Sequence, residues 1–273
     1  MRFNITIPMP FGALAFILLT VLVIYLVRRS APKRRPPDLV PEKNKVAVIL
    51  LEEIRFYQRL DEPSRERFLH RVMDFLSTIR ITGVGATVED VDRVMIGASA
   101  IIPIFRFEGW QYVNLNEVLL YPETFDEQFR QQGNGRSVLG MVGNGHMQYV
   151  MVLSQFALRE GFRNKTDKNN TAIHEFVHLV DKTDGDVDGV PEVLVNHQLA
   201  APWMRMMHDQ ISEIRKGKSD INPYGASSEP EFLAVASEYF FERPELLKEK
   251  HPELFAMLDT IFTPHTRKTP AKI

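Results

Sequence analysis

The segment Thr171-Ala-Ile-His-Glu-Phe-Val-His-Leu-Val-Asp181 contains the pattern His-Glu-x-x-His, with histidines at 174 and 178. Its apolar residues recur at helical spacing, so we expect a helix over 170–182. Positions four apart lie on one helix face, and His174 and His178 can therefore present two imidazoles to one metal ion. Glu175 lies beside them, where its carboxylate can take a proton from a metal-bound water. Core packing alone explains the apolar residues of this segment but not its His–Glu–His spacing.

A third metal ligand must come from elsewhere in the chain, because a catalytic zinc usually has three protein ligands and one open position. The candidates are Asp181, Asp184, Glu231 and Glu238. Asp181 lies about 10 Å from His174 along the helix axis, too far to share the ion unless the helix turns back. Glu231 and Glu238 fall on a second expected helix. Glu231 also fits the N3 position of a capping box that starts at Ser228, and spacing alone leaves the two glutamates about equally placed.

The composition narrows the class of protein. The chain has 273 residues, no cysteine, 18 phenylalanines and a net charge of −2. Residues 1–35 hold six basic residues and no acidic one, so residues 36–273 carry a net negative charge. This negative charge argues against a domain that binds nucleic acid. The missing cysteines exclude disulfides, thiol catalysis and cysteine-ligated metal. They leave histidines and carboxylates as the metal ligands.

The N-terminal segment has the pattern of a membrane anchor. Residues 3–27 carry no charge and would span about 37 Å as a helix, whereas a bilayer core needs roughly 20 such residues. We expect an uncleaved single-pass anchor at 1–29 and a stiff, proline-rich basic linker at 30–43. Five basic residues follow the span and only Arg2 precedes it, so positive-inside reasoning places the rest of the chain in the cytoplasm. The expected location is the inner or plasma membrane.

The remainder reads as a mainly helical α+β domain with a small sheet, over residues 44–265, followed by a polar tail at 266–273. Helical spacing predicts helices over 44–80 with a break near Glu62, and over 87–105, where the cap begins at Thr87. Further expected helices are 193–215, 229–242 and a short last one from His251. Strands are expected at 113–121 and 148–153, and a glycine-rich loop at 130–145.

Three segments resemble the Mlc titration factor A family of zinc peptidases, namely His174–Asp181, Asp184–Pro191 and Tyr224–Phe241. A weaker likeness includes Trp110 and Glu117–Pro122, and the whole resemblance covers roughly residues 45–262. It implies a zincin-like metallopeptidase domain. The transmembrane helix expected before that domain is a departure from the family, whose best-known members are soluble. The family's site is similar to that of the anthrax lethal factor catalytic domain, in which a tyrosine precedes the glutamate ligand by seven positions.

Tyr224 and Glu231 have that separation. The resemblance therefore implies one zinc ion per chain with the ligands His174, His178 and Glu231. It also implies Glu175 as general base and Tyr224 near the scissile carbonyl. Glu238 lies two turns further along the same helix face, where it can serve as the hydrogen-bond partner of a ligand histidine.

These features favour a membrane-anchored zinc peptidase that hydrolyses peptide or protein substrates with a metal-bound water. The alternative is a zinc-containing regulatory module that sequesters a protein partner with little turnover, and the complete base Glu175 favours the enzyme. No residue identifies a regulatory partner. The acidic segment Asp184–Gly189 resembles half of a calcium loop, but Val195 stands where a bidentate glutamate is needed, so we expect a solvated loop there.

Overall fold

The computed structural model describes residues 40–264 except 127, 132–135, 144, 165, 192–193 and 196, and except the side chains of 146 and 197. The helices are α2 (Lys43–Glu53), α3 (Arg55–Gln58), α4 (Glu62–Thr78), α5 (Asp90–Ile104), α6 (Gln155–Arg163), α7 (Thr171–Asp181), α8 (His197–Arg215), α9 (Glu229–Glu242), α10 (Pro244–Lys250) and α11 (Pro252–Ile261). The strands are β1 (Arg80–Gly83), β2 (Glu117–Tyr121), β3 (Gly140–Val142) and β4 (Val150–Ser154). Short 3-10 turns are η1 (Gly145–Met147), η2 (Lys182–Asp184) and η3 (Pro223–Ala226).

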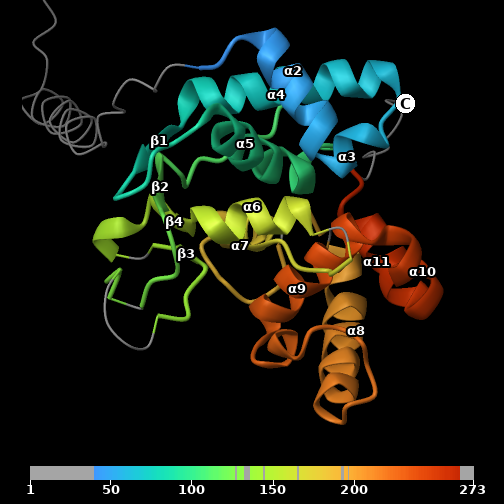
Figure 1. Cartoon of the computed structure of the whole chain (residues 1–273). Coiled ribbons are helices and arrows are strands. Elements are labelled where there is room, and N and C mark those ends of the chain that lie inside the picture. Colours follow the sequence, from blue (N-terminus) through green and yellow to red (C-terminus); the bar gives the residue numbers. More distant parts are fainter. Residues whose placement is uncertain are drawn as a thin grey trace, which may run out of the picture. The chain divides into compact units, whose positions relative to one another are not determined.

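The sheet has the order β1-β2-β4-β3, and its first three strands are parallel while β3 pairs antiparallel with β4. The chain passes from β1 through α5 to β2, the crossover that a parallel pair requires. Helix α7 packs against β3, β4 and α9 (Figure 1). The helix that carries the two histidines therefore lies between the antiparallel edge of the sheet and the helices that follow it.

Helix α5 is the centre of the core, and every residue from Val94 to Ile104 is buried. It packs against α2, α4, α6 and α7, which confirms the expected buried helix in this part of the chain. The cap differs from the expectation: Glu89, not Thr87, is the N-cap, and its capping-box partner is Asp92. The physical reason for this difference is that a residue of α6, far away in the sequence, also binds Asp92 and holds it at the N3 position.

That residue is Arg159, whose Nε and Nη2 donate to Asp92 Oδ1 and Oδ2 at 2.7 and 2.9 Å. Asp92 is fully buried. We expect Arg159→Ala to lower the free energy of unfolding by about 3 kcal/mol, because it leaves a buried carboxylate without its cation. Chemical denaturation measures this change. Lys216→Ala, which breaks the exposed pair with Glu213 at 2.9 Å, is the control and should leave the midpoint nearly unchanged.

The sheet is larger than the sequence predicted. β2 falls within an expected strand, and β4 overlaps the other expected strand and ends one residue beyond it. β1 begins at the last residue of the run expected to be helical, and β3 lies inside the segment expected to be a glycine-rich loop. Both missed strands are short and gain their stability from pairing with distant segments. Helices α6 and α10 were also not predicted, whereas α7 and α9 confirm the expected helices.

The predicted anchor at 3–27, most of the linker and the polar tail lie outside the described residues. In the described part of the chain, none of the helices combines the length and apolarity that a membrane span requires.

Candidate metal centre

Helix α7 starts at a buried cap and turns its apolar face to the core. The side chain of Asn170 accepts a hydrogen bond from the backbone N–H of Ile173, which satisfies one of the free donors of the first turn. Ile173, Phe176 and Val177 are buried in the main core. The remaining face carries His174 and Glu175, which are also mostly buried.

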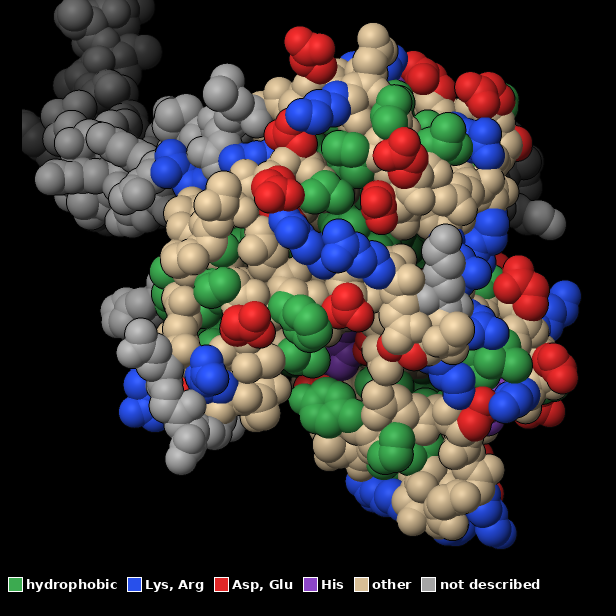
Figure 2. All heavy atoms as spheres, in the orientation of Figure 1, with side chains coloured by type: hydrophobic (Ala, Val, Ile, Leu, Met, Phe, Trp, Pro, Cys, Tyr) green, Lys and Arg blue, Asp and Glu red, His purple; other side chains and the backbone are tan. Residues whose placement is uncertain are grey.

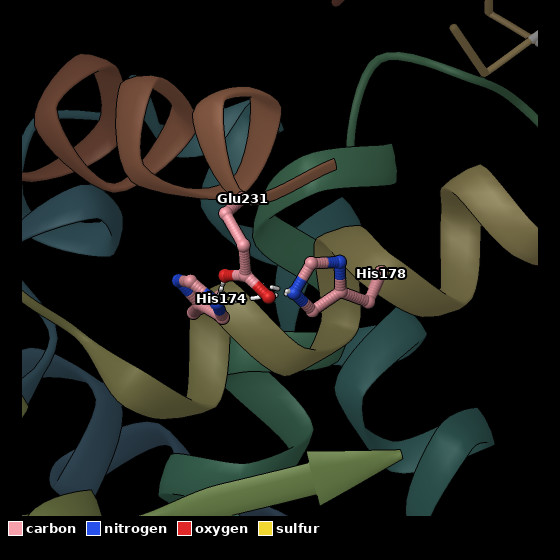
Figure 3. A group of neighbouring side chains, drawn as sticks. All are labelled: His174, His178 and Glu231. Atoms are coloured by element: carbon pink, nitrogen blue, oxygen red, sulfur yellow. Dashed lines mark hydrogen bonds and ion pairs between the residues drawn. The ribbon is translucent and has the colours of Figure 1, made fainter. Parts of the chain in front are cut away.

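His174 and His178 point toward Glu231, which descends from the first turn of α9 (Figure 3). The Nε2 atoms of the two histidines lie 3.0 Å apart, and Glu231 Oε2 lies 2.9 Å from that of His174 and 3.5 Å from that of His178. A tetrahedral ion with bonds of about 2.0–2.1 Å separates its ligand atoms by about 3.3 Å. The donor set and its spacing therefore fit a single zinc-like cation.

Glu231 occupies the N3 position of the expected capping box, but its carboxylate contacts the histidines. Its backbone N–H donates to the hydroxyl of Ser228, the N-cap of α9, as a capping box predicts. Its carboxylate meanwhile contacts the histidines. Burial opposes ionisation of this carboxyl, but hydrogen bonds and charge from His174 and His178 outweigh burial and hold the pKa of Glu231 well below its usual range.

Glu238 lies on the other side of His174. Its Oε1 is 2.7 Å from His174 Nδ1, and its Oε2 accepts a hydrogen bond from the backbone N–H of Asn170. A carboxylate on Nδ1 fixes the ring and leaves Nε2 as the metal-facing nitrogen. The structure thus distinguishes two glutamates that spacing alone left equivalent. Glu231 belongs to the three-donor group, and Glu238 is the hydrogen-bond partner of His174.

Glu175 is 6% exposed and faces the strand β3. Burial raises the pKa of its carboxyl, although the charges of His174 and His178 act in the opposite direction. A base with a raised pKa is suited to proton transfer near neutral pH. The backbone of Gly140 packs on this side chain so closely that an added Cβ would lie 2.7 Å from Glu175 Cγ and 2.9 Å from its Oε1.

We therefore expect Gly140→Ala to displace the Glu175 carboxylate and lower kcat by about 100-fold, since a shift of about 1 Å at a reacting group has effects of that size. Metal content should stay at the wild-type level, because the three atoms nearest to the added methyl group belong to Glu175 and Thr171 and none to the histidines or Glu231. Steady-state kinetics and metal analysis together measure the two effects. Leu139→Ala, which shortens an exposed side chain in the same segment, is the control. An unchanged kcat in Gly140→Ala would contradict the expectation.

A cleft of about 480 Å³ opens over these residues. Figure 2 shows histidine atoms at the bottom of a hollow in this face of the molecule. The cleft is bounded by β3 on one side and by η3 and the start of α9 on the other; its lining includes Gly140, Val142, Lys182, Val187, Tyr224 and Pro230. His174, His178 and Glu231 all line this cleft, so the donor group is open to it.

Tyr224 lies on η3 at the rim of this cleft and is 55% exposed. Its ring centroid is 6.0 Å from that of His174. Partial burial, followed by the charges of Glu231 and Glu175, raises the pKa of its phenol. The hydroxyl therefore stays protonated and can donate a hydrogen bond into the cleft.

The other acidic candidates do not join the site. Asp181 is buried at the end of α7, where its Oδ2 accepts the N–H of Gly189 at 3.0 Å. Burial raises the pKa of Asp181 to about 7. Among the described residues, the group found with metal-like spacing is His174, His178 and Glu231, and neither Asp184 nor the acidic loop after it belongs to that group.

Sequence reasoning missed two residues that shape the site, Gly140 and Asn170. Gly140 lies in a segment whose glycines suggested a loop. Asn170 could have been found as the polar residue that precedes the metal-binding helix, the usual position of an N-cap.

A His-Glu-x-x-His helix, a glutamate from a crossing helix and a cleft over both define a metallopeptidase site. The sequence matches the model of the family described as "Glucose-regulated metallo-peptidase M90" over residues 28–263, and the chain belongs to this family. It is therefore a hydrolase of a family that acts on peptides or proteins.

Similar curated proteins support this assignment. The chain is 25% identical to Mlc titration factor A of Cronobacter sakazakii over 234 residues, which cover 78% of this chain and 86% of that protein. It is 27% identical to Mlc titration factor A of Enterobacter sp. over 237 residues, covering 81% and 84%. A protein of Synechocystis sp. called slr2042 is 24% identical over 221 residues, covering 77% and 80%.

Proposed function

We propose that this protein is a zinc-dependent peptidase in which His174, His178 and Glu231 hold the ion and Glu175 is the general base. The observation that carries the proposal is the convergence of three donor atoms beside a buried carboxylate at the floor of an open cleft. Three nearby carboxylates, those of Glu175, Glu231 and Glu238, supply the negative charge that favours a divalent cation over water at this place.

Zinc, when bound, supplies a Lewis acid that polarises the scissile carbonyl and lowers the pKa of a coordinated water to about 7. Glu175 then accepts a proton from the attacking water and returns it to the leaving amine. The hydroxyl of Tyr224 donates a hydrogen bond to the oxyanion that develops on the carbonyl. Each role matches the burial and position of its residue.

Strand β3 is suited to hold the substrate main chain. Leu139 O accepts from Ser154 N, and Gly143 N donates to Val150 O, so these residues face β4. By the alternation of antiparallel pairing, Gly140 and Val142 direct their N–H and C=O groups away from β4 and toward an added strand. An extended peptide paired there would pass over Glu175.

The test is metal analysis of the purified domain, residues 36–273, together with digestion of a peptide library before and after removal of the metal. We expect about one zinc per chain and cleavage that disappears with a chelator and returns with zinc. Folded protein without bound zinc would overturn the proposal. Bound zinc without cleavage of any library peptide would favour the module that sequesters a partner.

We also propose that residues 3–27 anchor the protein in the inner or plasma membrane, with the peptidase domain in the cytoplasm. The uncharged span and the basic residues after it support this location. Deletion of residues 1–29 should move the protein from the membrane fraction to the soluble fraction, and intact cells should protect the domain from added protease. Full-length protein in the soluble fraction would argue against the anchor.

A further inference from the structure

Asn170 makes a hydrogen bond that caps the metal-binding helix and two further hydrogen bonds that join the start of this helix to α9. Its side-chain Oδ1 accepts from Ile173 N at 3.1 Å and caps α7. Its backbone N–H donates to Glu238 Oε2, and its side-chain Nδ2 donates to Glu242 Oε1 at 2.9 Å. Asn170 is fully buried.

The two carboxylates lie one turn apart on the same face of α9, and Glu231 lies two turns before Glu238. Packing of the buried residues from Phe232 to Phe241 holds α9 on α7, and hydrogen bonds at two successive turns add a polar constraint on its rotation and axial position. Glu238 is at the same time bound to His174 Nδ1 at 2.7 Å. The position of Glu231 above the histidines therefore depends on contacts made at the opposite end of α9.

Asn170 itself is held in place from the other side. Gly161 of α6 approaches so closely that an added Cβ would lie 3.1 Å from Asn170 Cγ. The carbonyl oxygen of Asn170 also accepts the N–H of His174 at 3.0 Å, the first hydrogen bond of the helix. A residue packed on one side and bonded on three others has little freedom to reorient.

We propose that Asn170 is a positioning residue for the metal centre: through Glu242 and Glu238 it sets α9 against α7 so that Glu231 meets His174 and His178. It touches neither the metal position nor the cleft. The inference rests on the metal site proposed above, and it assigns to Asn170 and Glu242 an effect on metal affinity beyond the stability of the fold.

Asn170→Asp isolates the contact with Glu242. Aspartate is as good a helix cap as asparagine, and the backbone N–H to Glu238 is unchanged. The substitution replaces the Nδ2 donor with a carboxylate oxygen that faces the carboxyl of Glu242. Because burial already raises the pKa of Glu242 to about 7, this carboxyl must either repel the new charge or take up a proton. We expect the metal affinity to fall about 10-fold, the lower end of the range found when direct partners of ligand residues are removed, because Asn170 and Glu242 act on the ligands through α9.

The double variant N170D/E242Q should recover most of this loss, because the amide of a glutamine at 242 donates to the new carboxylate and restores the bond with its polarity reversed. Ser154→Ala is the matched control. Ser154 is a fully buried N-cap on α6, bonded to Ala157 N at 3.2 Å, and its loss weakens a helix without touching α9. We expect this variant to keep the wild-type metal affinity.

The measurement is a competition titration of metal-free protein with Zn²⁺ and a chromophoric chelator at pH 8, with the visible spectrum of the Co²⁺ form as a readout of ligand geometry. A folded N170D protein with wild-type affinity would overturn the inference, and so would a double variant as weak as N170D. If N170D does not fold, Asn170→Ser keeps a cap but has no amide donor, and unchanged affinity there would also overturn it. Absence of metal binding by the wild type would overturn the proposed function and this inference with it.

Discussion

Glu175→Gln should lower kcat/KM for peptide cleavage by about 10²- to 10⁴-fold while the protein keeps its metal, since that is the usual contribution of a general acid–base residue. The substitution preserves the size of the side chain that packs on Gly140, so the fold of α7 and β3 should not change. The glutamine amide cannot accept and return a proton as the glutamate carboxylate can, so the substitution removes this function alone. Kinetics with a fluorogenic peptide and metal analysis of the same sample measure both effects.

The control for this experiment is Glu160→Gln, which makes the same chemical change on the exposed face of α6. It should leave kcat/KM at the wild-type value. Cleavage by Glu175→Gln at the wild-type rate would remove Glu175 from the mechanism, and the proton acceptor would have to be sought elsewhere in the cleft.

Glu231→Gln should abolish metal binding, whereas Glu238→Gln should only weaken the affinity for the metal. Glu231 supplies a donor atom at 2.9 Å from His174 Nε2, and Glu238 contacts the opposite nitrogen of the same ring. Removal of a partner of a ligand typically costs about 10- to 100-fold in metal affinity, and loss of a charged ligand should exceed that range. Chelator competition on metal-free samples gives both values.

Glu229→Gln is the matched control, because Glu229 lies on the same first turn of α9 but is half-buried and pairs with His208 at 3.5 Å, away from the metal centre. It should bind metal like the wild type. If Glu238→Gln lost the metal more completely than Glu231→Gln, the assignment of the two glutamates would have to be reversed.

The sequence predicted the parts of the site that depend on local spacing. His174, Glu175 and His178 belong to one helix, and 3.6 residues per turn is enough to place them together. The resemblance to a known family added Glu231, and the geometry agrees with it. Spacing alone left Glu231 and Glu238 open because both lie on one face of α9, and the choice between them depends on where α9 crosses α7.

Long-range contacts account for what the sequence did not predict. β3 has three residues, one of them Gly140, and exists because it pairs with β4 and packs on Glu175. The cap of α5 shifted by two residues because Asp92 is bound by Arg159, 67 positions away. β4 and Arg159 lie outside the sequence segments from which the loop and the Thr87 cap were predicted, so these segments alone could not indicate the strand or the shifted cap.

The donors of the metal centre come from two helices, and His174 and Glu231 are 57 positions apart in the chain. An unfolded chain holds no such site, so metal binding adds to the free energy of unfolding. At a free metal concentration 1,000 times the dissociation constant the gain is about 4.1 kcal/mol, a large share of the total for a domain of this kind. The supply of the metal ion would then govern the lifetime of the protein as well as its activity, since the metal-free form would be the easier substrate for other proteases.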